Sequence, residues 1–351
     1  MESCTVQSRS LRFHYWQAGR GRPLILLHGF PQTSYAWRHQ VESLSDTCAV
    51  FAPDTRGFGG TDKPRHRVTR SLLARDLIDF MDALGIERAS LVGHDWGGMI
   101  AFKAALDFPD RFERVACIDT TCSVWIPWAL NGYWFKVEGL AEEFFQDHHR
   151  AFIDLLFAGI PADYAGPPET PWPNRLPPGA NPGRLFGSDA LEQYRRAYAD
   201  PDCHFHCISY YRHGAPFHRR RGDAFEFMPE SEIARMWRHP GGIQAHPDHG
   251  EFLVYAPEDL HLRYAGPALL VYTPTVVPGP FQPGGSHADF ARGNPAAAAF
   301  ATHFSDLQTV GHPGSHFVPE EEPELLERCL RAWLARPDAR LASSRSTGTA
   351  S

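Results

Sequence analysis

The chain has 351 residues, of which 43% are hydrophobic and 21% are charged, so it carries enough apolar material for a large buried core. A formal net charge of −7 gives no electrostatic reason to expect nucleic acid or an anionic membrane as a partner. The seven cysteines are scattered and odd in number, which is typical of reduced thiols and excludes a disulfide framework as the organising principle.

Targeting and membrane signals are the next features that bound the function. Residues 1–10 lack the basic start and the apolar stretch of a signal peptide, and we find no uninterrupted apolar run long enough to cross a bilayer. We therefore expect a cytoplasmic protein that acts on a small-molecule substrate, with no nucleic acid and no membrane as partners. A homodimer is left open.

The first third of the chain alternates short apolar runs with helix-length amphipathic stretches. We expect strands at 24–27, 49–53, 90–92 and 114–118. This alternation predicts an α/β fold around a mostly parallel sheet. Glycine, aspartate or histidine follows each run, and in an open parallel sheet these residues share the rim where ligands bind.

The middle of the chain interrupts this pattern. Residues 124–262 are rich in aromatic residues, histidine and proline, and predict an inserted, mainly helical lid. The alternation returns with strands at 268–272 and 307–310 and helices at 295–304 and 323–335. The predicted organisation is therefore a core at 1–123, a lid at 124–262, a second core part at 263–336 and a flexible tail at 337–351.

Residues 90–98 carry the strongest chemical signal. They read Ser-Leu-Val-Gly-His-Asp-Trp-Gly-Gly, an apolar strand that enters a tight turn before a helix. This pattern predicts a nucleophile elbow with Asp95 at its centre, and the small residues Gly93 and Gly97 allow the close packing that such a turn requires. The helix N-terminus favours the ionised form of Asp95.

A carboxylate nucleophile restricts the reactions that Asp95 can perform. It needs no base to activate it, and its attack on an sp3 carbon forms an alkyl ester on the protein. Epoxides and carbon–halogen bonds offer such a carbon. Water activated by a histidine can then attack the ester carbonyl, whose developing oxyanion needs hydrogen-bond donors.

Two further loops supply candidates for the second step. His-Gly-Phe-Pro follows the 24–27 strand, and we expect the N–H groups of Phe30 and Trp96 to form an oxyanion hole. Gly-His-Pro-Gly-Ser-His-Phe follows the 307–310 strand, and His316 is the predicted general base with His312 as its competitor in the same loop.

The acid that orients the histidine is harder to place. The strand that follows the lid ends in Val-Tyr-Thr-Pro-Thr-Val-Val, which contains no carboxylate. The strand that precedes the lid ends in Ile-Asp-Thr, so we predict Asp119 as the acid, with Asp289 as the reserve.

These motifs together resemble the epoxide hydrolase and haloalkane or haloacetate dehalogenase branch of the α/β-hydrolase family. The resemblance rests on His-Gly-Phe-Pro at 28–31, the turn at 54–59, Gly-His-Asp-Trp-Gly-Gly at 93–98 and Ser-His-Phe at 315–317. It covers both core segments, about two thirds of the chain, and implies the α/β-hydrolase fold. The lid matches loosely.

Within the branch, the lid determines the class of substrate. Epoxide hydrolases use lid tyrosines as proton donors, and Ser-Tyr-Tyr-Arg at 209–212 is similar to that lid segment, which implies Tyr211 as the donor. Tyr133 is the candidate second donor, although a gap-free reading puts Asn131 at that place. The expected substrate contacts are Trp96, Tyr133, Trp134 and Tyr210.

Dehalogenases of the branch are the first alternative. Haloalkane dehalogenases hold halide with an asparagine and with the tryptophan that follows the nucleophile. That tryptophan is present here as Trp96, but Phe30 replaces the asparagine. Fluoroacetate dehalogenases carry an arginine pair that binds the substrate carboxylate. This chain has Trp96 and Met99 at those positions, so a small haloacid would lack these ionic contacts. The resemblance therefore implies an epoxide hydrolase acting on a medium-sized apolar or aromatic epoxide, with a hydrolytic dehalogenase and a non-catalytic binding protein as alternatives.

A cysteine and histidine cluster in the lid has metal-ligand residue types. It reads Cys-His-Phe-His-Cys at 203–207, but it lacks paired Cys-x-x-Cys units, so helix packing is the favoured interpretation over zinc. We expect neither a metal nor a cofactor.

Overall fold

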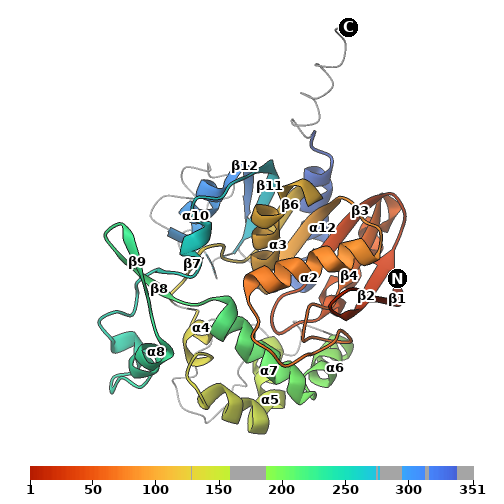
Figure 1. Cartoon of the computed structure of the whole chain (residues 1–351). Coiled ribbons are helices and arrows are strands. Elements are labelled where there is room, and N and C mark those ends of the chain that lie inside the picture. Colours follow the sequence, from red (N-terminus) through yellow and green to blue (C-terminus); the bar gives the residue numbers. More distant parts are fainter. Residues whose placement is uncertain (128, 159–186, 274–275, 277–294, 313–315, 338–351) are drawn as a thin grey trace.

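A mostly parallel sheet of eight strands forms the centre of the structure (Figure 1). The computed structural model describes residues 1–127, 129–158, 187–273, 276, 295–312 and 316–337. The strand order is β1-β2-β4-β3-β5-β6-β11-β12, and only the pairs β1–β2 and β2–β4 are antiparallel. The strands are β1 (Glu2–Gln7), β2 (Arg12–Ala18), β3 (Arg22–Leu27), β4 (Cys48–Pro53), β5 (Ala89–His94), β6 (Phe112–Ile118), β11 (Tyr264–Tyr272) and β12 (Phe304–Gly311).

Two hydrophobic cores lie on opposite faces of this sheet. Along β3, Ile25 and Leu27 join one core while Leu24 and Leu26 join the other, as the period of two in a strand requires. Helices cover both faces, so the strands are apolar on both sides and the predicted α/β class is confirmed. The core helices are α1 (Arg38–Ser43), α2 (Arg70–Ala83), α3 (Trp96–Asp107), α10 (Pro295–His303), α11 (Val318–Glu321) and α12 (Pro323–Leu334).

A mainly helical insertion separates β6 from β11, and in Figure 1 it lies below the sheet. Its helices are α4 (Asn131–Trp134), α5 (Leu140–Ala158), α6 (Ser188–Ala197), α7 (Pro201–Ser209), the π-helix η5 (Tyr210–Gly214) and α8 (Glu230–Trp237). It also contains a small antiparallel sheet that the sequence did not predict. Its strands, in the order β7-β10-β8-β9, are β7 (Val124–Trp125), β10 (Leu253–Val254), β8 (His218–Arg221) and β9 (Ala224–Phe227).

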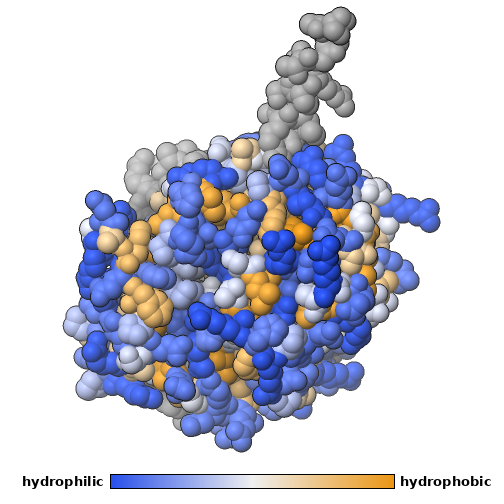
Figure 2. Space-filling model, viewed as in Figure 1, coloured by the Kyte–Doolittle hydropathy of each residue, from blue (hydrophilic) through white to orange (hydrophobic). Residues whose placement is uncertain are grey.

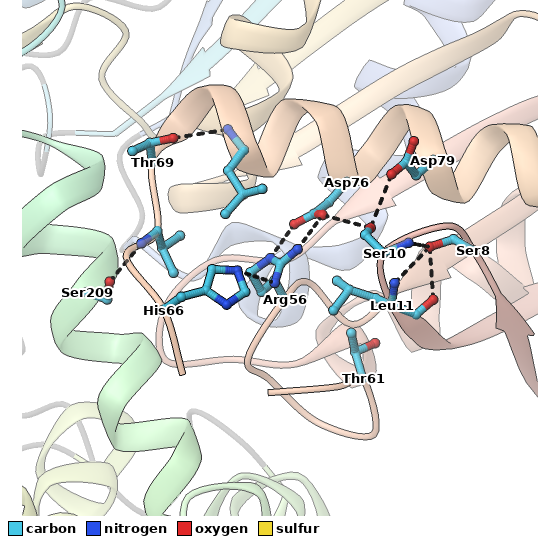
Figure 3. Close-up of polar contacts among 12 residues, drawn as sticks. Ser8, Ser10, Leu11, Arg56, Thr61, His66, Thr69, Asp76, Asp79 and Ser209 are labelled. Atoms are coloured by element: carbon cyan, nitrogen blue, oxygen red, sulfur yellow. Dashed lines mark hydrogen bonds and ion pairs between the residues drawn. The ribbon is translucent and has the colours of Figure 1, made fainter. Parts of the chain in front are cut away.

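The insertion is tied to the core by hydrogen bonds as well as by aromatic packing. The hydroxyl of Tyr210 donates to the carbonyl of Arg56 at 2.9 Å, and the Val68 N–H donates to the Ser209 hydroxyl at 3.1 Å. Arg56 in turn forms a buried two-pronged ion pair with Asp76 on α2, as Figure 3 shows. The π-helix that carries Tyr210 is thus anchored to the rim of the sheet.

On the face in Figure 2, apolar side chains lie scattered among hydrophilic ones. Among the helices that the structure describes, none combines the length and the apolar character of a membrane span. The predicted core and lid boundaries, the cytoplasmic location and the absence of a membrane partner stay predictions, and residues 338–351 of the predicted tail lie outside the described residues.

Candidate active site

Asp95 occupies the tight turn between β5 and α3. Its φ is +49°, a left-handed conformation that L-residues rarely adopt and that is often found at functional sites. The turn depends on its small neighbours: a Cβ added to Gly93 would lie 2.1 Å from the carbonyl oxygen of Gly97, and one added to Gly97 would lie 2.1 Å from that of Leu27. The Asp95 side chain remains 21% exposed and can be reached from the adjoining cavity.

The loop after β3 places a donor on the Asp95 carboxylate. The N–H of Phe30 donates to Oδ1 of Asp95 at 2.8 Å. Close approach of this loop requires Gly29, because a Cβ there would lie 2.5 Å from that of Asp95. Trp96 is the first residue of α3, so its N–H belongs to the helix turn that lacks intrahelical partners. Both residues predicted for the oxyanion hole therefore adjoin Asp95.

His316 lies between two carboxylates. Its Nδ1 donates to Oδ2 of Asp119 at 2.6 Å, and its Nε2 lies 3.4 Å from Oδ2 of Asp95. The competitor His312 is turned elsewhere, with its Nε2 3.7 Å from Glu322. The loop that contains both histidines thus brings His316, and not His312, to Asp95.

Asp119 directly follows β6 and is fully buried. Its φ is +39°, and its Oδ1 accepts a hydrogen bond from the Thr273 N–H at 2.7 Å. Thr273 follows β11, the neighbour of β6 in the sheet, so the end of one strand braces the acid on the next. The reserve candidate Asp289 lies outside the described residues.

The charges of this group set its protonation. Burial lowers the pKa of His316, but the hydrogen bonds and charges of Asp119 and Asp95 outweigh burial and raise it to about 10. Burial raises the pKa of Asp95, but the hydrogen bond and charge of His316 outweigh it, so the net shift is downward. His94 stays neutral, because burial and then the charge of His316 lower its pKa to about 4. The Asp95 carboxylate and an imidazolium therefore face each other in the resting protein.

A cavity of about 730 Å³, including its mouth, opens beside Asp95. Its polar base is formed by Asp95, Asp119 and His316, and Tyr211 and Asn131 from the insertion also line it. Much of the remaining wall is apolar, and includes Phe30, Met99, Trp125, Ile126, Leu156, Val276 and Phe317. Such a cavity suits an apolar ligand with one reactive polar group.

Comparisons with known proteins agree with this geometry. A family model described as the α/β hydrolase fold matches residues 22–165. A solved structure, the epoxide hydrolase CorEH without ligand, is 22% identical with a TM-score of 0.66, and the match covers 95% of this chain and 98% of that one. The chain therefore has the α/β-hydrolase fold, and the predicted fold is confirmed. The predicted resemblance to the α/β-hydrolase family agrees with these matches.

Curated relatives of this chain are epoxide hydrolases. Epoxide hydrolase 4 of Homo sapiens is 44% identical over 118 residues, which cover 32% of this chain and 33% of that protein. The soluble epoxide hydrolase of Corynebacterium sp. (strain C12) is 42% identical over 108 residues, which cover 31% of this chain and 38% of that protein. The match thus spans between a third and two fifths of these relatives' length.

Among the described tyrosines of the insertion, Tyr211 lines the cavity. Its ring packs edge-on against those of Phe30 and Trp96, with centroids 5.2 and 5.1 Å apart. Its hydroxyl oxygen accepts a hydrogen bond from Nδ2 of Asn131 at 2.9 Å, and the amine of Lys136 donates to its carbonyl oxygen. A π-helix, often found at functional sites, carries Tyr211.

The substrate contacts predicted for Tyr133, Trp134 and Tyr210 stay predictions, and none of the three lines the cavity beside Asp95. Tyr133 is fully buried against Phe217, with centroids 5.2 Å apart. Trp134 packs within the insertion, and the Tyr210 hydroxyl is bound to the Arg56 carbonyl. Of the four predicted contacts, Trp96 lines the cavity.

Asn131 is a polar cavity residue of the insertion that the analysis of motifs left without a role. It begins α4, so Asn131 and Tyr133 project from different sides of a single helical turn. The gap-free register against the lid of the epoxide hydrolases was the signal that pointed to it. The chain therefore presents an amide where a second tyrosine was expected.

The cysteine and histidine cluster belongs to α7. Cys203, His206 and Cys207 are buried in the packing between the insertion and the core. Within the described ranges, no three histidine, cysteine or acidic side chains are grouped so that they could hold a metal ion. The expectation that no metal or cofactor is needed stays a prediction.

Proposed function

We propose that this α/β hydrolase is an epoxide hydrolase that acts through a covalent ester on Asp95. The observation that carries the proposal is the arrangement of three groups around one cavity: the Asp95 carboxylate, the Tyr211 phenol above it and the pair of His316 and Asp119 beside it. The epoxide hydrolases among the curated relatives support the same reaction class.

In the first step, Oδ2 of Asp95 attacks an epoxide carbon. The carbon–oxygen bond of the ring breaks, and the departing oxygen takes the proton of the Tyr211 hydroxyl. Oδ1 of Asp95 stays on the Phe30 N–H and becomes the carbonyl oxygen of the ester. The elbow and the oxyanion donor thus serve both the formation and the hydrolysis of the ester.

In the second step, His316 removes a proton from water that attacks the ester carbonyl. The raised pKa of about 10 keeps His316 protonated in the resting protein, and a protonated imidazole cannot act as a base. Esterification neutralises Asp95 and removes one of the two charges that hold the proton, so the pKa of His316 falls and its resting proton passes through solvent to the Tyr211 phenolate. Asp119 keeps the ring oriented, and the N–H of Phe30 stabilises the oxyanion. Asp95 is released as a carboxylate with the diol.

The cavity wall supports a medium-sized apolar or aromatic epoxide as substrate. Met99, Trp125 and Leu156 offer apolar surface to the substrate. A small haloacid would instead need charged side chains to bind its carboxylate. Hydrolytic dehalogenation and ligand binding without catalysis are the competing functions, and one experiment separates all three.

The test is intact-protein mass spectrometry of the His316→Gln variant. Incubated with a panel of aryl epoxides, it should gain the mass of one whole epoxide, while Asp95→Asn under the same conditions should gain none. An adduct that lacks the halide after incubation with haloalkanes or haloacetates would instead establish a dehalogenase. Binding without an adduct from either panel would favour a non-catalytic protein.

A further inference from the structure

Asn131 and Tyr211 reach the cavity from two different parts of the insertion. Asn131 begins α4 and Tyr211 lies in η5, 80 residues later in the sequence. The Asn131 amide donates to the Tyr211 hydroxyl oxygen at 2.9 Å. In the described part of the chain, Oδ1 of Asn131 has no partner, so this contact is the side chain's only polar link there.

The hydrogen bonds of Tyr211 decide where its proton points. The Asn131 amide donates to the phenol oxygen, and the Trp96 ring packs edge-on against the Tyr211 ring. A phenol O–H lies near the plane of its ring, and the oxygen accepts a hydrogen bond on the other side in that plane. With the acceptor position filled by Asn131, the O–H proton is left to point in the remaining direction. Among the described residues, no acceptor for that proton is found, and Tyr211 lines the cavity.

The same hydrogen bond acts on the charge that forms when Tyr211 loses its proton. Burial and then the Asp95 charge raise the pKa of Tyr211 well above its ordinary value, and the hydrogen bond from Asn131 opposes that rise. Esterification removes the charge of Asp95 in the step in which the phenolate forms. The Asn131 N–H then holds the phenolate oxygen in a cavity with much apolar wall, where hydrogen bonds to charged groups are strong.

We propose that Asn131 is a positioning residue that directs the Tyr211 proton to the substrate oxygen and stabilises the resulting phenolate. Tyr211 then serves as the single proton donor of the lid, and the buried Tyr133 has no part in the reaction. The inference rests on the proposed epoxide hydrolase function and deepens it.

The proton balance of the complete cycle is closed. Tyr211 gives its proton to the ring oxygen as the bond from Asp95 to carbon forms. Before the second step, the resting proton of His316 passes through solvent to the Tyr211 phenolate, which leaves His316 neutral. Water then gives one proton to His316 and its hydroxyl to the ester carbonyl. The diol oxygen leaves with the proton of that hydroxyl, so Asp95 is again a carboxylate and His316 again an imidazolium. The net reaction is epoxide plus water to diol.

An Asn131 amide with Oδ1 and Nδ2 exchanged would have the opposite effect on ester formation. If Oδ1 of Asn131 faced the phenol, it would accept the Tyr211 proton and hold it away from the substrate. Removing the amide would then leave ester formation unchanged or make it faster. The orientation of one amide group therefore decides between an activating and a restraining Asn131.

The experiment measures ester formation in single turnover by intact-protein mass spectrometry, with styrene oxide and the His316→Gln protein as parent. Asn131→Leu removes the donor, and Asn131→Asp keeps the shape but replaces the N–H donor by an acceptor. Both should slow ester formation about 10- to 100-fold, and Asn131→Gln should restore part of it. Phe227→Ala, on exposed β9 of the insertion, is the control and should match the parent.

A double-mutant cycle with Tyr211→Phe shows whether Asn131 acts through the tyrosine. Once Tyr211 is phenylalanine, Asn131→Leu should cause no further loss, which general damage to the lid would not reproduce. Unchanged or faster ester formation in Asn131→Leu, or additive losses in the cycle, would overturn the inference while the proposed function stands. A parent that forms no ester with styrene oxide or with the wider aryl epoxide panel would overturn both.

Discussion

Nδ1 of His316 lies 2.6 Å from Oδ2 of Asp119, although 197 residues separate them. The acid comes from the end of β6, and the neighbouring strand β11 ends in Thr273, whose N–H donates to the other oxygen of Asp119. Neighbouring parallel strands end at the same rim, so either strand end can present a group to the histidine. In this chain the end of β6 supplies the acid and the end of β11 supplies the donor that fixes it.

Asp119→Asn should uncouple the two steps of the reaction. The amide can still fill the space, but it favours the wrong tautomer of His316 and cannot stabilise the imidazolium. We expect ester hydrolysis to slow about 1,000-fold or more, with a much smaller effect on ester formation. Intact-protein mass spectrometry during turnover of an epoxide should show the ester accumulating.

Asp289→Asn is the matched control for that experiment, because Asp289 was the reserve candidate for the acid. It should leave both steps within a few-fold of the unchanged protein. Ester that accumulates in Asp289→Asn and not in Asp119→Asn would transfer the assignment to Asp289.

The charge of Asp95 should be measurable in the titration of His316. Both carboxylates raise the pKa of His316, which reaches about 10 in the resting protein. Asp95→Asn mimics the neutral ester and should lower that pKa, as the proposed switch from acid to base requires. Proton–carbon NMR of the His316 ring, compared with His316→Gln for assignment, measures the shift. The same pKa of His316 in Asp95→Asn and in the unchanged protein would contradict the switch.

The same pKa predicts how stability changes with pH. The pKa of His316 is raised from 6.5 to about 10 on folding, so its contribution is fully present below pH 6.5 and is lost as the pH rises toward 10. Between these limits, the Tm of the unchanged protein should fall more steeply than that of His316→Gln. Thermal unfolding at several pH values checks the sign, and parallel slopes would argue against the raised pKa.

The sequence predicted those parts of the site that a single strand, turn and helix define. Asp95 could be placed because glycines on both sides of it fit one known turn, and the acid because the post-lid strand lacks a carboxylate. The edge strand β1 and its neighbour β2 were missed because many of their positions are exposed or half-buried, so no continuous apolar run marks them. Hydrophobic periodicity detects the buried strands of a sheet far better than its edges.

The insertion was predicted less well, for a physical reason. The strand β7 is only two residues long and pairs with β10 far along the chain, so no local pattern reveals it. Asn131 and Tyr133 differ by two positions in a single helical turn, and only tertiary packing decides which side chain reaches the cavity. Aromatic composition indicates a packed lid, but it does not identify the residues that contact substrate.

The packing around the elbow predicts which glycine tolerates a methyl group. Gly97→Ala would place a Cβ 2.1 Å from the Leu27 carbonyl oxygen, and backbone on both sides leaves little room to relax. We expect a loss of about 3 kcal/mol in the free energy of unfolding, with reduced activity. Gly187→Ala is the control, since a Cβ there has nothing within 4 Å. Urea unfolding compares them, and equal stability would contradict the close packing.

The ion pair of Arg56 and Asp76 should matter because it is buried. Its two short contacts measure 2.6 and 2.7 Å, and both side chains are almost fully covered (Figure 3). Asp76→Asn leaves the Arg56 charge without its partner and should cost about 3–5 kcal/mol in the free energy of unfolding. The double variant Arg56→Met with Asp76→Leu removes both charges and should cost less than the single change. Urea unfolding of the two variants decides, because an equal or larger loss in the double variant would show that packing, and not charge, stabilises this link to the lid.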